Sequence, residues 1–408
     1  MAAALKGLRV IEGSAFVAAP LGGMTLAQLG ADVIRFDAIG GGIDYRRWPV
    51  SPEGRSIYWA GLNKGKRSVA VDLRSEEGRE LITSVVTAPG PDAGVFLSNF
   101  PNRGWLSDEA LRAGREDLIY LSIRGNPDGS TAVDYTVNAA AGFPLATGPV
   151  GVGLPTNHVL PAWDMAAGLS AAVGILAAER HRSRTGEGQF IGLSLADVAF
   201  AMVGNLGFLG QAQVLREDRP PLGNDMYGAF GRDFLTKERR RVMVVAISAR
   251  QWESLIRATQ IEEHIPWIEK AFDVDLSQEE GRYEAREALS ALLTRWFSRQ
   301  TLDSVASIFD AHGVCWGPYQ TFTELVDHDV RCSEENPMFT DIDQPGIGKL
   351  RTPGTPLSFS ALEREIPERA PDLGEHTEPV LAEILGLSTT EIGRLVDGQV
   401  VACAEPPV

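Results

Sequence analysis

Short apolar runs alternate with helix-compatible segments over the first 125 residues. Strands are predicted at 8–11 (LRVI), 32–36 (DVIRF), 68–73 (SVAVDL), 93–97 (AGVFL) and 118–123 (LIYLSI). Helices are predicted between them, at 20–29, 76–86 and 107–113. Strands and helices that alternate at this spacing indicate a parallel sheet covered by helices on both faces. Ligands of such sheets bind beyond the carboxyl ends of the strands, so we expect the site residues there.

The pattern changes after residue 125. Residues 126–161 are rich in Gly, Pro, Thr and Asn and show little periodicity, which indicates a long functional loop with one short helix near 137–141. A helix rich in Ala, Gly and Leu is predicted over 164–182, and Gly186 stands where a left-handed C-cap would end it.

A strand at 190–193 and a helix at 195–209 follow. The composition then shifts at 216–223 (REDRPPLG), which marks a candidate domain boundary. Beyond it the pattern is α+β, with a strand near 241–247 and helices near 251–259, 285–299 and 304–312. The tail is rich in Pro and Gly up to Glu375 and ends in short helices.

Length, composition and charge bound the function. Of the 408 residues, 44% are hydrophobic and 23% charged, as in an ordinary globular protein. A single hydrophobic core stops growing at roughly 250–300 residues, so two domains are expected. Lys plus Arg number 38 and Asp plus Glu 54, and the net charge of −16 argues against a nucleic acid or an anionic membrane as partner. The longest nearly continuous apolar stretch, 165–178, has 14 residues and is too short to span a bilayer.

Cysteine and histidine usage narrows the classes of chemistry. The three cysteines, Cys315, Cys332 and Cys403, form no CxxC pair, which disfavours a disulfide framework or a zinc site. With no visible secretory signal, a reducing cytoplasm is the expected location. The histidines are scattered and no HExxH is present, so metal catalysis is not expected.

Asp164, at the start of the predicted 164–182 helix, has two interpretations. An Asp at a helix start is most simply an N-cap, which accepts hydrogen bonds from free backbone N–H groups. A carboxylate in that position is also kept ionised by the helix dipole and can act as a nucleophile. The pattern alone leaves both open.

A cluster of cations precedes the strand at 68–73. Lys64, Lys66 and Arg67 lie within four residues of an acidic chain. They form either a solvated turn or a set of contacts for a phosphate, to which Lys and Arg donate charge-assisted hydrogen bonds.

Other polar side chains in the same half of the chain are candidates for the site. Arg46, Arg47 and Arg103 add cations on neighbouring loops. Asn99 and Phe100 directly follow the strand at 93–97, which places them at the carboxyl edge of the predicted sheet.

The sequence lacks the common cofactor and nucleophile fingerprints. It contains no GxGxxG after a strand, no Walker GxxxxGK[ST] and no GxSxG elbow, which disfavours NAD, ATP and a serine-hydrolase mechanism. His158 lies six residues before Asp164 and is either a substrate contact or a loop histidine bonded to backbone.

Eight stretches resemble family III CoA-transferases, the formyl-CoA transferase type, in chain order. They are LKGLRV (5–10), LGADVIR (29–35), LNKGKRS (62–68), NFP (99–101), GILAA (174–178), RTGEGQ (184–189), GVCWGP (313–318) and LGEHT (373–377). Because the match runs through essentially the whole chain, it is more specific than any one motif. The resemblance implies a Rossmann-like large domain with a parallel sheet, formed by 1–220 and 331–408, and a smaller α+β domain at 221–330. It also implies an interlocked homodimer.

The resemblance further implies a transferase whose nucleophile is Asp164, which matches the family's catalytic aspartate. An acyl-CoA thioester is then the substrate, and no metal or organic cofactor is expected. The implied binding residues are Val17, Ala18, Lys64, Lys66, Arg67, Asn99, Phe100 and Arg103, with Asn138, His158 and Arg47 near the nucleophile.

One activity of the family is disfavoured by the sequence. The racemases of the family use a His–Asp pair, but Val133 stands at the position of their histidine and cannot carry a proton.

Three other functions remain open within this resemblance. The first is movement of CoA between the two carboxyl groups of one dicarboxylic acid, since the stretches 12–20, 134–138, 157–164 and 227–234 resemble members with that activity. The alternatives are CoA transfer between two acids, for example from succinyl-CoA, and acyl-CoA binding without catalysis.

Overall fold

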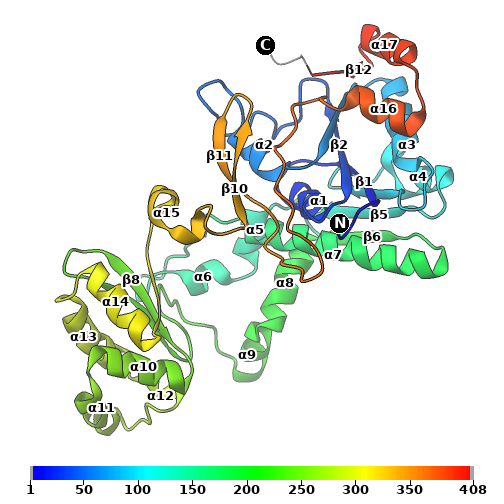
Figure 1. Cartoon of the computed structure of the whole chain (residues 1–408). Helices are drawn as coiled ribbons and strands as arrows, with labels where there is room; N and C mark the ends of the chain where they lie inside the picture. Colours follow the sequence, from blue (N-terminus) through cyan, green and yellow to red (C-terminus); the bar gives the residue numbers. More distant parts are fainter. Residues whose placement is uncertain (1–2, 405–408) are drawn as a thin grey trace. The chain divides into compact units, whose positions relative to one another are not determined.

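The computed structural model describes residues 3–404, which form two compact units. Unit 1 consists of the chain up to Ala141, of Val159–Gly210 and of the chain from Val330 onward. Unit 2 consists of Gly142–His158 and Gln211–Asp329. Figure 1 shows the elements of each unit along the chain.

The unit boundaries differ from those expected at residues 220 and 330. Residues 142–158 belong to unit 2 and not to the large domain. Backbone hydrogen bonds explain the difference, since the N–H of Leu222 donates to the carbonyl of Ala146 and that of Gly223 to Gly148, each at 2.9 Å.

A seven-stranded sheet forms the centre of unit 1, in the order β12-β3-β2-β1-β4-β5-β6. All neighbouring strands are parallel except β12, which joins β3 antiparallel at the edge. The strands are β1 (Arg9–Gly13), β2 (Asp32–Ala38), β3 (Arg67–Val71), β4 (Val95–Ser98), β5 (Ile119–Arg124), β6 (Phe190–Ser194) and β12 (Val401–Ala402). The strand order reverses between β1 and β4, and such a switch point is where open α/β sheets bind ligands.

Helices cover both faces of this sheet. One face carries α1 (Ala18–Ala27), α5 (Asp134–Ala140), α7 (Ala162–Thr185) and α8 (Leu195–Asn205). The other carries α3 (Glu76–Thr87), α4 (Asp108–Gly114), α16 (Thr377–Leu385) and α17 (Thr389–Asp397). Unit 1 also contains α2 (Ile57–Leu62), two short 3-10 helices (Gly104–Leu106 and Val330–Cys332) and the hairpin β10 (Phe339–Gln344) and β11 (Gly348–Pro353).

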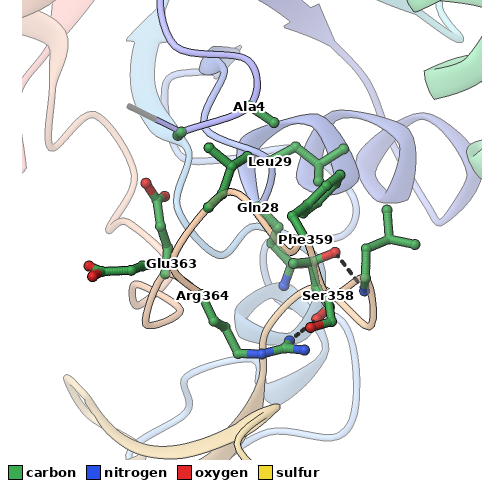
Figure 2. A pocket seen from close by; sticks show the side chains of 12 residues that line it. Ala4, Gln28, Leu29, Ser358, Phe359, Glu363 and Arg364 are labelled. Atoms are coloured by element: carbon green, nitrogen blue, oxygen red, sulfur yellow. Dashed lines mark hydrogen bonds between the residues drawn. The ribbon is translucent and has the colours of Figure 1, made fainter. Parts of the chain in front are cut away.

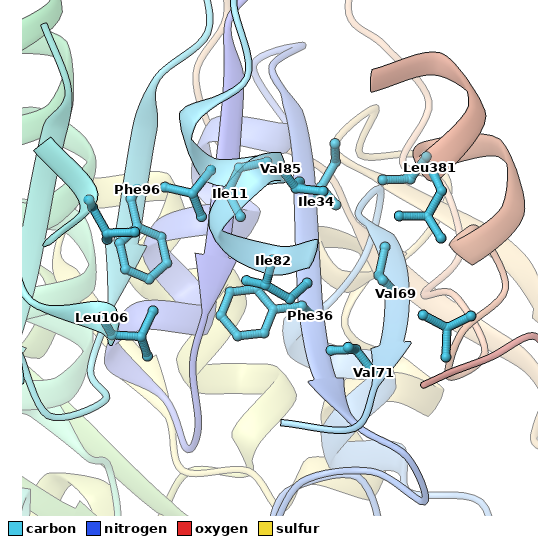
Figure 3. Packing of buried hydrophobic residues seen from close by; sticks show 14 of the residues in the cluster. Ile11, Ile34, Phe36, Val69, Val71, Ile82, Val85, Phe96, Leu106 and Leu381 are labelled. Carbon is cyan, nitrogen blue, oxygen red and sulfur yellow. The ribbon is translucent and has the colours of Figure 1, made fainter. Parts of the chain in front are cut away.

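The face of the sheet under α3 carries the main apolar core of unit 1 (Figure 3). Ile11 of β1 and Ile34 and Phe36 of β2 point to this face and pack against Ile82 and Val85 of α3. Because strand side chains alternate between faces, the neighbouring positions of β1 and β2 point to the α1 face instead.

Charged side chains are buried on that α1 face. Arg35 is 1% exposed and donates to the carboxylate of Asp37 at 2.9 and 3.0 Å and to that of Asp44 at 3.0 and 3.1 Å. Glu12 lies 3.7 Å from Arg35 and accepts a hydrogen bond from Lys66 at 2.9 Å. Each of these three carboxylates and two cations thus lies beside a group of opposite charge, which lowers the cost of burying it.

Gly23 lets α1 lie against this ionic network. A Cβ atom at that position would stand 1.7 Å from Oε2 of Glu12. The glycine therefore leaves the space that the buried carboxylate occupies.

Unit 2 is α+β, built on an antiparallel three-stranded sheet in the order β7-β8-β9. Its strands are β7 (Phe230–Leu235), β8 (Arg241–Ala246) and β9 (Cys315–Pro318). Its helices are α6 (Phe143–Thr147), α10 (Ala249–Thr259), α11 (Ile265–Phe272), α12 (Glu279–Glu284), α13 (Arg286–Phe297), α14 (Leu302–His312) and α15 (Phe322–His328), with a 3-10 helix at Glu262–His264. Alternate residues of β8, Val242 and Val244, are fully buried in one core with the helices α10, α13 and α14.

The expected fold class is confirmed, with a large parallel sheet and a smaller α+β unit. Gly186 ends α7 in the left-handed conformation, with φ of 78°, as expected. The helix predicted at 195–209 is two helices, α8 and α9 (Phe208–Leu215), bent by 60°, because Gly207 between them has φ of 81°. Within residues 3–404 no single helix is long and apolar enough to cross a membrane, although α8 and α9 taken together pass by length and composition alone.

Replacement of Arg35 by Met should destabilise unit 1 by about 3–5 kcal/mol, because it leaves buried carboxylates without their main cation. Urea unfolding of the whole chain measures this loss. Arg74→Met is the matched control, since the Arg74 side chain is 95% exposed and an exposed pair contributes at most about 1 kcal/mol. Equal unfolding free energies for the two variants would contradict the role of Arg35.

Candidate active site

Asp164 lies in the first turn of α7, at the carboxyl edge of the sheet. This helix leads into the amino end of the parallel strand β6, so its own start lies at the opposite edge. A Cβ atom on Gly168 would stand 2.6 Å from the carbonyl oxygen of Ala18, so α7 and α1 meet closely near their first turns. The edge where β1 and β4 diverge therefore receives the starts of both helices.

The interpretation of Asp164 as an N-cap is wrong, because another aspartate performs that role. The backbone N–H groups of Trp163 and Asp164 donate to Oδ2 of Asp134 on α5, at 2.7 and 3.1 Å. Pro161 occupies the N-cap position and offers no side-chain hydrogen bond. No residue among 3–404 donates a hydrogen bond to the carboxyl oxygens of Asp164, which leaves them available for chemistry.

The pKa of the Asp164 carboxyl is raised to about 6, first by burial and then by the negative charge of Asp134, whereas the charge of Arg47 acts in the opposite direction. Asp134 is itself 2% exposed, and its Oδ1 is buried without a hydrogen-bond partner in the described chain. At neutral pH Asp164 is therefore ionised, yet its pKa is raised, and it is a better nucleophile than a solvated aspartate.

A cation and a hydroxyl group lie in the electrostatic reach of this carboxylate. The guanidinium carbon of Arg47 stands 5.2 Å from the ring centroid of Tyr58 and 5.7 Å from that of Phe16, in cation–π geometry. Burial raises the pKa of Tyr58 to about 12, and the charge of Asp164 contributes in the same direction. Tyr58 therefore remains a neutral donor at physiological pH, beside an exposed arginine.

Tyr58 is a site residue that the sequence analysis missed, since no element was predicted around it. A signal is present, because Ser56 precedes the apolar run of α2 and its hydroxyl accepts the N–H of Trp59 at 3.0 Å. A serine before a short apolar run is a typical helix start.

Asn99 fixes the loop after β1 at the switch point. Its Oδ1 accepts the N–H of Ala15 at 2.9 Å and its Nδ2 donates to the carbonyl of Ala15 at 2.7 Å. Phe16, which follows Ala15 in the chain, has φ of 67°, a left-handed conformation that costs a non-glycine residue on the order of 1 kcal/mol. Val17 and Ala18 then begin α1, whose first turn has no side-chain cap and so offers N–H groups at this edge.

Phe100 and Arg103, both expected among the acyl-CoA contacts, differ in their surroundings. Phe100 packs edge-on against Phe36, 6.2 Å between ring centroids, as part of the apolar core. Arg103 is exposed, and its guanidinium makes no hydrogen bond or ion pair within residues 3–404. Arg103 thus remains available to a ligand.

The cations Lys64, Lys66 and Arg67 are not at the ligand-binding edge. Lys64 and Lys66 precede β3 and Arg67 is its first residue, and the start of a parallel strand lies at the amino edge of the sheet, opposite the switch point. Lys66 is buried and donates to Glu12, to the carbonyl of Pro20 and to Asn63. Arg67 is paired with Asp32 and Glu383, and Lys64 bonds the carbonyl of Gly61.

Asn138 and His158 are the two further residues expected near the nucleophile. Asn138 is fully buried, and its Oδ1 accepts the indole N–H of Trp163 at 3.1 Å, so it supports the start of α7 from behind. His158 belongs to unit 2, where its Nδ1 is buried and has no partner in the described part of the chain.

A hollow of about 790 Å³ lies beyond the carboxyl ends of β2 and β3. Ala38, Ile39, Leu73 and Arg74 line it from these strands, and the chain around Gln399 lines it from the other side. Arg74 is a cation that the sequence analysis did not single out, although it follows its strand directly. No group of three or more His, Cys, Asp or Glu in residues 3–404 is arranged to hold a metal ion.

Comparisons with known proteins agree along the length of the chain. Residues 5–377 match the model of CoA-transferase family III. The chain is 52% identical, over 98% of each sequence, to 2-methylfumaryl-CoA isomerase of Chloroflexus aurantiacus. It is 29% identical to succinyl-CoA:mesaconate CoA-transferase of Haloarcula hispanica, covering 95% of this chain and 98% of that one.

A solved structure shows the same architecture. The crystal structure of a CAIB/BAIF family protein from Brucella suis aligns with a TM-score of 0.77 at 26% identity, over 94% of this chain and all of that one. Together with the match over residues 5–377, this shows that the chain belongs to CoA-transferase family III.

Proposed function

We propose that this protein moves CoA between the C1 and C4 carboxyl groups of mesaconyl-CoA, converting 2-methylfumaryl-CoA into 3-methylfumaryl-CoA. The observation that carries the proposal is the 52% identity, over 98% of the chain, to a relative named 2-methylfumaryl-CoA isomerase. The free, partly buried carboxylate of Asp164 supports it, because intramolecular CoA transfer needs a nucleophile that can carry an acyl group.

In the proposed mechanism, Asp164 exchanges with CoA on both carboxyl groups in turn. A carboxylate oxygen of Asp164 attacks the C1 thioester carbonyl, so the C–S bond breaks, a mixed anhydride forms and CoA leaves as the thiolate. The thiolate then attacks the aspartyl carbonyl, which forms an aspartyl-CoA thioester and frees mesaconate as the carboxylate. The C4 carboxylate attacks this thioester and expels the thiolate again. Attack of the thiolate on the C4 carbonyl gives the product and restores the Asp164 carboxylate.

The surroundings of Asp164 fit the needs of these steps. Oxyanions form at each attack, and the uncapped N–H groups at the start of α1 and the neutral hydroxyl of Tyr58 are donors at this edge. The carboxyl group that does not carry CoA must be held, and Arg47 is the cation whose charge acts on Asp164. Aromatic rings on Phe16 and Tyr58 fix its guanidinium there.

The nucleotide end of CoA is assigned to the hollow beyond β2 and β3. Its volume of about 790 Å³ is in the range of ligand pockets, and it lies at the edge where parallel sheets bind ligands. Arg74 and Arg103 are exposed cations that can pair with its phosphates.

A second candidate function is CoA transfer between two acids. It is favoured by the 29% identity to a relative named succinyl-CoA:mesaconate CoA-transferase. The two functions differ in one measurable respect, which is whether free mesaconate exchanges with mesaconate that is bound as the CoA ester.

The test is incubation of mesaconyl-C1-CoA with the protein and ¹³C-labelled free mesaconate. The CoA esters are then separated by chromatography, and the mass of each is measured by mass spectrometry. The C4 ester should form without label. Asp164→Ala should abolish transfer and still fold with native stability, because Asp134 caps α7. Labelled ester, or transfer only after succinyl-CoA is added, would establish the second candidate. Full turnover by Asp164→Ala would exclude the nucleophile.

The pH dependence of transfer should follow the ionisation of Asp164. Protonation removes the nucleophile, so kcat/KM should fall as the pH drops through about 6. Asp134→Asn keeps an oxygen for the N–H groups of α7 but removes the charge that raises this pKa, so the acid limb should move to lower pH. Asp128→Asn, on an exposed turn after β5, is the matched control and should leave the limb in place. If the acid limb of the pH profile stayed in place in Asp134→Asn, Asp134 would act only as the cap of α7 and would not raise the pKa of Asp164.

Arg47→Gln should lower kcat/KM for mesaconyl-CoA at least tenfold, since the free carboxylate loses its cation. The adjacent Arg46→Gln removes the same charge from a side chain that lines a different hollow, beside Tyr45 and Trp59, and should cost less than threefold. Steady-state kinetics of the two variants compare them directly. Equal losses would show that only the general positive field matters.

We further propose a homodimer, in which a second copy covers the apolar side chains of α8 and α9. The helix α9 has no buried residue, and Val214 is 78% exposed. The helices span 11 and 8 residues, roughly 17 and 12 Å at 1.5 Å per residue, and each is shorter than a bilayer core. Light scattering should give about 88 kDa, twice 44.0 kDa, and a mass near 44 kDa would contradict the dimer.

A further inference from the structure

A second hollow in unit 1 lies at the amino edge of the sheet, away from the candidate active site. Its volume is about 320 Å³, and residues that precede β1, β2 and β3 line it: Lys6, Ala31 and Lys64. We propose that this hollow binds a small anion, whose carboxylate, phosphate or sulfate group accepts hydrogen bonds from the ammonium of Lys64.

Lys64 is a buried cation with most of its hydrogen-bonding capacity unused. It is 7% exposed, and of its three N–H donors one has a protein partner, the carbonyl of Gly61 at 2.8 Å. It forms no ion pair within residues 3–404. Lys66, two residues further on, is also buried but uses all three donors and pairs with Glu12. One of these two neighbouring lysines is therefore complete, and the other lacks an anion.

The lack of large side chains keeps this hollow open. Its lining includes Ala3, Ala27, Gly30, Gly65 and Gly354. A Cβ atom at Gly65 would have only the methyl group of Ala27 within 4 Å. At roughly 30 Å³ for each water molecule, the volume corresponds to about ten waters, which is enough for a small organic acid.

A smaller hollow beside it does not offer the same capacity (Figure 2). It shares Ala3, Gln28, Thr355 and Glu365 with the larger one but has a volume of about 50 Å³. Gln28 and Leu29 at the end of α1 line it together with Phe359 and Arg364. No buried cation lines this smaller space, which holds one or two waters.

The charges around the larger hollow favour an anion at its inner end. Lys6, Glu365 and Glu368 also line it, and all three are exposed, so solvent screens them. Burial lowers the pKa of the Lys64 ammonium to about 8. A bound anion would compensate its charge and raise the pKa again, so the anion should bind more tightly below pH 8 than above it.

Calorimetric titration of the whole protein tests the proposal, with sodium sulfate and sodium succinate as separate probes at constant ionic strength. Both probes keep their charge between pH 7 and 9.5. At least one should bind saturably at pH 7 and at least tenfold more weakly at pH 9.5. Lys64→Met should weaken this binding at least tenfold. The adjacent rim variant Lys6→Met should change it less than threefold, and Arg47→Gln separates it from binding at the candidate active site.

Ala27→Leu provides a second variant, which fills the hollow and leaves Lys64 in place. It should also weaken binding, and thermal unfolding of both variants shows that they fold. The proposal is overturned if neither probe saturates, if the affinity is the same at both pH values, or if Lys64→Met binds as tightly as the native protein. Binding lost in Arg47→Gln but kept in Lys64→Met would place the anion at Asp164 and also overturn it.

Discussion

One buried guanidinium, that of Arg35, connects the loops on which the candidate active site depends. It donates to the carbonyl of Ser14 after β1 at 3.0 Å, to Asp44 after β2 and to Asn63 before β3 at 3.1 Å. The loop from Ser14 continues into Phe16, and the N–H of Arg47 donates to the carbonyl of Asp44. Because a buried charge is stable only with all of its partners, the three loops must close in one arrangement. The positions of the loops at the candidate active site therefore depend on the hydrogen bonds and ion pairs of Arg35.

Two aspartates at the start of α7 have different roles. Asp134 accepts hydrogen bonds from the free backbone N–H groups of the helix, while the carboxyl group of Asp164 accepts none from the described residues. An aspartate that capped its own helix would have a lowered pKa and occupied oxygens, both of which oppose attack on a thioester. Asn138, one turn after Asp134, holds the indole of Trp163, so α5 fixes the backbone on which the proposed nucleophile stands.

Local patterning predicted the parallel strands, the long helices and the importance of Asp164, because those signals lie in contiguous residues. It could not predict Asp134 as the cap, since that hydrogen bond joins residues 29 and 30 positions apart. The charge cluster at Lys64–Arg67 could not be assigned to an edge of the sheet for a related reason. Its composition suggests contacts with an anion, but only the direction of β3 in the sheet shows that the cluster lies at the amino edge, opposite the candidate active site. The resemblance to a family supplied what spacing alone left open, namely the choice between cap and nucleophile.

The edge strand β12 has a consequence for how the chain is made. It pairs Val401 with Val71 and Ala402 with Ala70, so residues separated by more than 300 positions close one side of the central sheet. During synthesis, β3 remains an open parallel edge until β12, more than 300 residues further along the chain, has been made, and exposed edges of this kind allow pairing with other molecules. Unit 2, largely contiguous from Gln211 to Asp329, is complete well before that moment. In the nascent protein, unit 2 can therefore fold before the sheet of unit 1 gains its edge strand β12.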